Sequence, residues 1–96
     1  MIILDLLKKQ DYYAYELNKV LNKFISINES TAYAIFKKLV DKGLVSYYLA
    51  ESSNGPVRKY YKITKLGLEK LKEYLENWNE FVNLVQNFID ENKQDN

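Results

Sequence analysis

The sequence predicts a mainly α-helical fold with one small β-hairpin and a long C-terminal helix. Apolar residues recur every three or four positions over residues 2–42 and again after residue 64, as on one face of a helix. Between these regions, residues 45–63 are rich in β-branched and aromatic residues around a cluster of turn formers, which is typical of two short strands. A chain of 96 residues is one small domain.

The first two helices are predicted within residues 2–23. Residues 2–9 are apolar on nearly all sides apart from Asp5, and residues 10–11 form a connection. We expect the second helix from Tyr13 to about Lys23, because its apolar residues are separated by three and four positions. These apolar residues are Tyr13, Leu17, Val20, Leu21 and Phe24.

The third helix is expected over about residues 29–42. Asn28 can cap its free backbone N–H groups, and Glu29 favours the first turn through the helix dipole. Gly43 suits the position after the last turn, where a left-handed backbone is common. One stripe of apolar residues is expected to face the core: Ala32, Ile35, Phe36, Leu39 and Val40.

Two strands are expected over residues 45–49 and 57–63, joined by a turn that contains glycine and proline. Thr64 can cap the last helix, which is predicted to run to about Glu91, with residues 93–96 fraying. At about 1.5 Å per residue, that helix is about 40 Å long.

This order of elements matches a winged helix-turn-helix over residues 1–65, followed by a C-terminal helix over residues 66–92. The two parts differ in charge. Residues 1–65 hold 11 Lys/Arg and 6 Asp/Glu, a balance of +5, whereas residues 66–96 hold 3 and 7, a balance of −4. These sum to the net charge of +1. A basic front indicates that this part faces a polyanion.

The third helix is then the expected recognition helix, and residues 45–63 are the wing. Hydroxyls and lysines suit contact with DNA, because lysine neutralises phosphate and Ser/Thr side chains bond phosphates or base edges. We expect double-stranded DNA to be bound by residues 28–42 and the wing. The candidate contacts are Asn28, Ser30, Thr31, Tyr33, Ala34, Lys37, Lys38, Gly55, Arg58 and Lys59. The cations are expected at phosphates, and Ser30, Thr31 and Tyr33 at base edges.

Four segments carry a resemblance to a known family. Residues 14–17, AYEL, are similar to the family's G-Y-E-I segment, and residues 28–34, NESTAYA, to its S-E-G-T-L-Y-P stretch. Residues 38–45, KLVDKGLV, follow K/R-L-E-x-x-G-L-V, and residues 54–64, NGPVRKYYKIT, resemble the wing sequence G-G-P-x-R-K-Y-Y-x-L-T. In this order and spacing, the segments resemble the PadR family of winged-helix transcriptional regulators. The resemblance implies a DNA-binding regulator, which we expect to act as a repressor.

Within this family the sequence is most similar to the short-tailed, multidrug-sensing repressors. Residues 28–39, NESTAYAIFKKL, follow their recognition-helix sequence N-E-A-T-L-Y-x-I-F-K-R-L. Two positions depart from the general family pattern, since Ser30 stands where the family often has Gly and Ala34 where it often has Pro. The start of the recognition helix is therefore expected to differ in detail from the family's.

A coiled-coil-like pattern of apolar residues runs along the C-terminal helix. Its positions are spaced by 4, 3, 4, 3 and 4: Leu71, Leu75, Trp78, Val82, Val85 and Ile89. Tyr74, Phe81 and Phe88 widen this face. Because a 65-residue domain cannot cover a stripe about six turns long, we expect a second copy to cover it and form a homodimer. Two-fold symmetry would then place two recognition helices on two half-sites of a palindromic operator.

Trp78 is the only tryptophan, and two interpretations of it stay open. It is either a packing residue in the dimer seam or part of a site for a planar aromatic or cationic effector. The resemblance implies the second role, because multidrug-sensing relatives stack a flat aromatic ligand between the tryptophans of the two subunits. The pocket residues would be Trp78, Leu75, Val82, Asp5 and Met1. Asp5 would attract a cation, with cation–π support from Trp78, or it is simply an exposed helix residue.

Composition excludes several classes of protein. The chain has no His, no Cys, no phosphate-binding glycine loop and no paired carboxylates, so we expect no enzyme, no metal and no cofactor. A membrane-spanning helix needs about 18 consecutive apolar residues, and no apolar run in the sequence comes close to that length. The first residues lack the basic leader of a signal peptide, and the absence of cysteine suits a reducing cytoplasm. We therefore expect a cytoplasmic protein.

Two alternatives to DNA binding differ in their predictions. A helical homodimeric interaction module would dimerise without any affinity for DNA, whereas a DNA-binding protein loses affinity steeply with salt as phosphate counterions are released. RNA binding is disfavoured, because the tyrosines are expected in core stripes or in the wing and not on an open sheet face.

Overall fold

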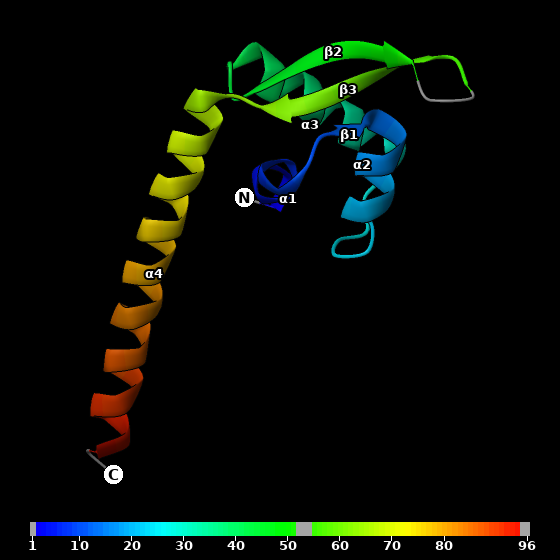
Figure 1. Cartoon of the computed structure of the whole chain (residues 1–96). Coiled ribbons are helices and arrows are strands. Elements are labelled where there is room, and N and C mark those ends of the chain that lie inside the picture. The colour runs from blue at the N-terminus through cyan, green and yellow to red at the C-terminus, as the bar shows by residue number, and fades with distance from the viewer. Residues whose placement is uncertain (1, 52–54, 95–96) are drawn as a thin grey trace.

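The computed structural model describes residues 2–51 and 55–94. Helices and strands follow one another along these residues as shown in Figure 1. They are α1 (Ile2–Lys9), β1 (Tyr12–Tyr13), α2 (Ala14–Leu21), α3 (Glu29–Asp41), β2 (Val45–Glu51), β3 (Val57–Ile63) and α4 (Lys65–Gln94). The predicted fold class is confirmed: a mainly helical winged helix-turn-helix with a small β-hairpin and a long C-terminal helix.

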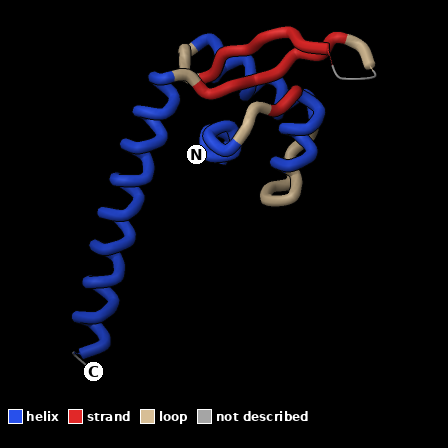
Figure 2. The backbone as a smooth tube through the Cα atoms, in the orientation of Figure 1, coloured by secondary structure: helices blue, strands red, loops and turns tan. Residues whose placement is uncertain are grey.

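The core lies between the three short helices and one face of the sheet. Figure 2 shows these helices clustered beside the strands, while α4 extends away from them. We call residues 2–63 the head. All but one of the buried apolar residues belong to it. They are Ile3, Leu4, Leu6, Leu7, Leu17, Leu21, Ala32, Phe36, Leu39, Leu44, Val45 and Tyr61 in the head, and Leu71 in α4.

The sheet has three antiparallel strands, with β3 in the middle. β2 and β3 form the predicted hairpin, which begins with Val45 opposite Ile63. β1 was not predicted, because the second helix was expected to begin at Tyr13. Tyr12 and Tyr13 pair instead with β3, and Tyr13 becomes the residue that precedes α2. A two-residue strand has no periodicity of its own, so only its pairing with a distant strand reveals it.

The tyrosines of the sheet are divided between its two faces, because side chains alternate along a strand. Tyr61 is buried against Phe36 of α3, with ring centroids 5.5 Å apart. By the register of the strands, Tyr13, Tyr48 and Tyr60 share the other face, away from the core. Tyr48 and Tyr60 thus lie in the wing, as expected, whereas Tyr13, expected in the apolar stripe of a helix, lies in the sheet.

The second helix is shorter than predicted. It ends at Leu21, and the backbone N–H of Phe24 then donates to the Leu21 carbonyl at 3.0 Å, which closes a turn. The Asn22 backbone N–H still makes the helical bond to the Asn18 carbonyl at 3.0 Å, but the next N–H, that of Lys23, donates at 3.1 Å to the Val20 carbonyl three residues back, so the last turn tightens and the helix ends. As a result Phe24, predicted on the apolar face of the helix, is exposed.

The chain is closely packed where the head meets α4. Gly43 has φ +77° and ends the third helix in the left-handed conformation that the sequence predicted. The Thr64 hydroxyl donates to the Gly43 carbonyl at 2.6 Å and accepts from the Gly67 N–H at 3.0 Å, so Thr64 caps α4 as predicted. A Cβ atom at Gly67 would clash with the Leu44 carbonyl, which explains why a glycine is needed inside this helix.

The last helix is longer than predicted. It runs past Glu91 to Gln94, so the first two residues of the tail that was expected to fray are helical. Asp95 and Asn96 lie outside the described residues. The helical pattern continues because residues 92–94 contain neither glycine nor proline.

Most of α4 lies apart from the head (Figure 1). Every residue from Lys72 to Lys93 is exposed. Leu71, which was predicted as a dimer contact, is buried in its own chain at 2% exposure. The apolar residues that follow it remain uncovered. Over residues 2–51 and 55–94, no helix is both long and apolar enough to cross a lipid bilayer.

Candidate nucleic-acid interface

The start of α3 is fixed by a side-chain cap. The Asn28 Oδ1 accepts a hydrogen bond from the Thr31 backbone N–H at 2.8 Å and another from the Ser30 hydroxyl at 3.0 Å. Asn28 and Ser30 were predicted as DNA contacts, and both side chains are occupied with the cap. The expected departure at Ser30 thus leaves an ordinary helix start, because asparagine is among the best capping residues.

The exposed face of α3 carries the remaining predicted contacts of this helix. Thr31, Ala34, Lys37 and Lys38 are all exposed, at spacings that keep them on one side of the helix. The first two side chains are small and let a DNA backbone approach closely, and the last two are cations. This face therefore combines close approach with positive charge.

Tyr33 lies at the edge of this face, where it is half-buried against Phe36 with ring centroids 5.8 Å apart. Burial and the nearby Glu29 carboxylate raise the pKa of the Tyr33 hydroxyl. A tyrosine hydroxyl is protonated at neutral pH with or without this shift, and a protonated hydroxyl can donate a hydrogen bond to a phosphate or a base.

The two cations of the wing point to opposite faces of β3. The Arg58 Cζ lies 4.4 Å from the ring centroid of Tyr13, and the side chain is half-buried. The Lys59 Nζ lies 4.0 Å from the ring centroid of Tyr47 and is exposed. Both cations therefore make cation–π contacts with tyrosine rings of their own chain. Gly55 is exposed at the entry to β3.

A cleft of about 410 Å³ lies between α3 and the sheet. Tyr33 and Lys37 line it from α3, and Lys59 lines it from the wing. The structure therefore brings together residues that are far apart in the sequence and were predicted to share one function. In the described part of the chain, the ion pairs are Asp5–Lys9 and Lys70–Glu73. The cations of this face are in neither pair.

The contribution of the start of α2 was not predicted from the sequence. A second hollow joins Tyr13, Ala14 and Tyr15 to Tyr33 and to the two wing cations. Tyr15 is exposed, and its ring stacks on Tyr13 with centroids 6.5 Å apart. The signal that could have located these residues was the cluster of tyrosines at positions 12, 13 and 15, read together with the tyrosines of the wing.

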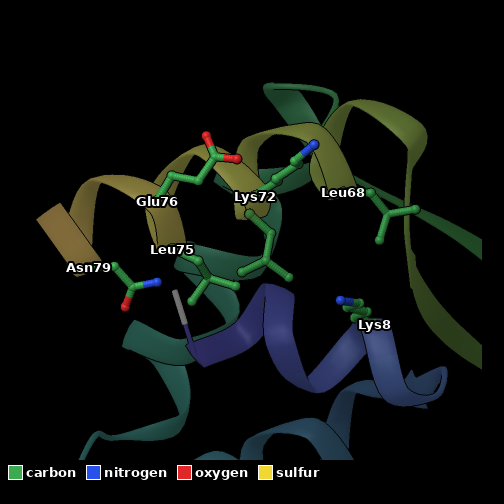
Figure 3. Close-up of a pocket in the computed structure, with 7 residues that line it drawn as sticks. Lys8, Leu68, Lys72, Leu75, Glu76 and Asn79 are labelled. Carbon is green, nitrogen blue, oxygen red and sulfur yellow. The ribbon is translucent and has the colours of Figure 1, made fainter.

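The predicted effector residues lie along α1 and α4. Leu75 points from α4 toward α1 and lines a groove of about 300 Å³, which Lys8 borders from the other side (Figure 3). Trp78 is 60% exposed, and its ring centroid is 6.0 Å from that of Phe81. Val82 is also exposed. Asp5 is half-buried and pairs with Lys9 at 3.7 Å, and Met1 lies outside the described residues.

The predicted dimer residues other than Leu71 are exposed on α4. The list comprises Tyr74, Phe81, Val85, Phe88 and Ile89. Their spacing places them on one side of the helix, the side that also carries Trp78 and Val82. The head covers none of them.

Comparison with known proteins assigns this architecture to a family. The sequence pattern of the PadR-like family of transcriptional regulators matches residues 3–73, which include all of the head except Ile2 and also the start of α4. The chain belongs to this family. The resemblance of the sequence to PadR proteins is thereby confirmed, and so are the predictions of a DNA-binding transcriptional regulator and of a protein that is not an enzyme.

Solved structures of PadR-like proteins share the fold. A PadR-like transcriptional regulator from Bacillus cereus is 36% identical, with a TM-score of 0.82 over 92% of this chain and 87% of that protein. PadR of Bacillus subtilis, solved in complex with operator DNA, is 28% identical, with a TM-score of 0.66 over 76% of this chain and 44% of that protein. A Lysinibacillus sphaericus protein is 36% identical over 93 residues, which cover 93% of this chain and 85% of the relative.

Proposed function

We propose that this PadR-like protein is a homodimeric repressor that binds a palindromic operator through α3 and the wing. One observation carries the proposal: residues of α3, of the wing and of the start of α2 converge on one side of the head, around two adjoining hollows. This side combines unpaired cations with neutral hydroxyls, as contact with a phosphate backbone and with base edges requires. Bacillus subtilis PadR was solved in complex with operator DNA, which supports operator binding by this chain.

The test measures binding to a fluorescein-labelled duplex that the protein has selected from a random pool. We expect the affinity to fall steeply as salt rises, because each neutralised phosphate releases counterions. Lys38→Ala should weaken binding on every sequence and reduce the salt slope by about 1, whereas Thr31→Val should change the preference among sequences. Lys72→Ala, which removes a cation from exposed α4, is the matched control and should change neither quantity.

A homodimeric interaction module without DNA binding is the second candidate function. The long uncovered face of α4 favours it, because that face serves association whether or not the head binds DNA. This alternative predicts dimers with no salt-dependent affinity for any selected duplex. Such a result would exclude the regulator function for this chain.

We also propose that the dimer interface holds an inducing ligand, a planar aromatic or cationic compound, next to Trp78. The exposed tryptophan and the neighbouring groove between α1 and α4 support a site at this position (Figure 3). Leu75 and Val82 lie one turn on either side of the tryptophan, and Asp5 belongs to α1, the helix that borders the groove. Met1, the other residue proposed for this site, lies outside the described residues. The ligand would relieve repression by binding the DNA-free state more tightly than the DNA-bound state.

The effector test follows Trp78 fluorescence during titration with proflavine, a planar aromatic cation. Saturable quenching together with a loss of DNA affinity is the expected result. Trp78→Phe serves as the blank, since it keeps an apolar ring and removes the signal. DNA binding without quenching would assign Trp78 to packing in the dimer seam, which is the other interpretation of this residue.

A further inference from the structure

We propose that Tyr13 is a positioning residue, which holds the wing's Arg58 in place for contact with the DNA backbone. This inference rests on the proposed DNA binding, and it adds a residue that is distant from Arg58 in the sequence and lies on another element. Arg58 is the only arginine of the chain, and it is the cation of the head with the most restricted surroundings.

The surroundings of Arg58 identify the tyrosine ring as its support. The guanidinium carbon lies 4.4 Å from the Tyr13 ring centroid, within the range of a cation–π contact. The Nε atom is buried and has no hydrogen-bond partner among the described residues. A guanidinium that stacks flat on a ring keeps its terminal N–H groups at its rim, where they can bind a phosphate in a bidentate manner.

Tyr13 is itself held from several directions. Its backbone pairs with Tyr60 in the sheet, and its N–H donates to the Glu16 carboxylate at 3.3 Å. The Tyr60 ring meets the Tyr13 ring edge-on, with centroids 5.7 Å apart and an interplanar angle of 76°. The ring that supports Arg58 is therefore fixed by both the backbone and a neighbouring side chain.

Contacts between tyrosine rings continue from Tyr13 across the other two strands of the sheet. Tyr48 of β2 stacks on Tyr60, with centroids 5.6 Å apart and an interplanar angle of 12°. The Tyr48 hydroxyl donates to the Asp11 carboxylate at 2.7 Å, and Asp11 lies just before β1. We call these three rings, of Tyr13, Tyr60 and Tyr48, the tyrosine ladder. It joins all three strands on the face away from the core and ends at Arg58.

The same geometry argues against a base-stacking role for this face. Proteins that bind single-stranded nucleic acid offer free ring faces to unstacked bases. In the tyrosine ladder, Tyr60 and Tyr48 cover each other, and the guanidinium covers a face of Tyr13. The ladder therefore acts as an internal support for Arg58.

Holding Arg58 in place should strengthen DNA binding, because a free arginine loses rotamer entropy when it is immobilised at an interface. We expect Tyr13→Leu, which removes the ring, to weaken binding by about three- to tenfold. Tyr13→Phe keeps the ring and should bind within about twofold of the unmodified protein. Rescue by phenylalanine separates the ring's effect on Arg58 from any contact made by the hydroxyl.

A double-mutant cycle tests whether Tyr13 acts through Arg58. Anisotropy is measured with the selected duplex for Tyr13→Leu, for Arg58→Ala and for the double variant. If Tyr13 acts through Arg58, the double variant binds as weakly as Arg58→Ala alone. Additive losses would overturn the proposal, because they would mean that Tyr13 contributes to binding by itself.

A second measurement needs no DNA. In a ¹H–¹⁵N spectrum the single arginine gives one side-chain Nε–H resonance, and a ring stacked beneath it shifts that resonance upfield. We expect the shift in the unmodified protein and in Tyr13→Phe, and its loss in Tyr13→Leu. An unshifted resonance in the unmodified protein would overturn the proposal. If Tyr13→Leu does not fold, the position of the resonance in the unmodified protein still tests the proposal. Arg58→Lys, which lacks the resonance, then confirms that the signal belongs to Arg58.

The two measurements distinguish this inference from the proposed function. If the arginine resonance is shifted but the protein binds no duplex, the proposed DNA binding is refuted. The contact between Arg58 and Tyr13 would then exist without a role in DNA binding. Salt-dependent DNA binding that Tyr13→Leu does not weaken would leave the proposed function standing and refute only the role of Tyr13.

Discussion

The head and α4 have similar apolar patterns in the sequence, but their apolar side chains differ in burial. In the head, Phe36 and Leu4 are almost completely buried by their own chain. In α4, Phe81 and Val85 follow the same helical spacing and are exposed. Periodicity tells which face of a helix is apolar, but it does not tell whether the covering surface belongs to the same chain. The head buries its apolar residues within one chain, whereas the apolar face of α4 is left exposed by its own chain.

The strongest test of this difference removes a buried ring from the head. Phe36→Ala should destabilise the protein by about 3–5 kcal/mol, because it leaves a cavity in a core that has no other way to fill it. Urea denaturation followed by circular dichroism measures the loss. Phe24→Ala removes an exposed ring from the same head and should cost less than about 0.5 kcal/mol. Equal losses would contradict the burial contrast.

The next test places a charge on the uncovered face of α4. Val85→Asp should separate the dimer, because association would bury an unpaired carboxylate at a cost of several kcal/mol, about a hundredfold or more in the dimer dissociation constant. Sedimentation equilibrium measures that constant. Asn83→Asp adds the same charge to the opposite side of the helix and should leave the dimer intact. A monomeric unmodified protein would show that α4 is not covered by a second copy.

A smaller effect is expected where the head meets α4. Gly67→Ala should destabilise the protein by about 1–3 kcal/mol, because the new Cβ meets the Leu44 carbonyl and the Ile63 side chain at 2.7 Å. Thermal unfolding measures this loss. Lys72→Ala changes the same helix one turn beyond the contact and should be close to neutral. If Gly67→Ala did not change the stability, α4 would be able to move away from the head at no cost. The two regions would then be even less dependent on each other.

The smallest of these effects concerns the cap of α3. Asn28→Ala should cost about 1 kcal/mol, because the Thr31 N–H loses its acceptor, whereas Asn28→Ser keeps an oxygen there and should be nearly neutral. Urea denaturation resolves this difference. If Asn28→Ala were neutral in stability and yet weakened DNA binding, Asn28 would be a direct contact, as the sequence first predicted.

The parts of the fold that were predicted correctly depend on neighbours in the sequence. α1 and β3 have their predicted bounds, and the caps at Asn28 and Thr64 were recognised from residue type and position. β1 was missed because a two-residue strand is stabilised only by its distant partner. The burial of Leu71 was missed for a related reason, since its spacing continues the exposed pattern of α4 without a break.

The site was predicted in part. The exposed cations and hydroxyls of α3 follow from the helical period, which separates them from the buried stripe. The contact of Arg58 with Tyr13 could not be predicted in this way, because the strand register that brings them together is a tertiary property. Tyr15 was likewise recognisable as part of a family motif without any indication of its position beside Tyr33.

The close packing at Gly67 makes α4 a lever with a fixed pivot. From this residue to Gln94 the helix is about 40 Å long, so each degree of rotation at the pivot moves the far end by about 0.7 Å. In a dimer joined along α4, the same rotation changes the separation of the two recognition helices, which must match one helical turn of DNA, about 34 Å. In such a dimer, the absence of a side chain at position 67 would fix the angle between α4 and the head, and with it the spacing of the two recognition helices.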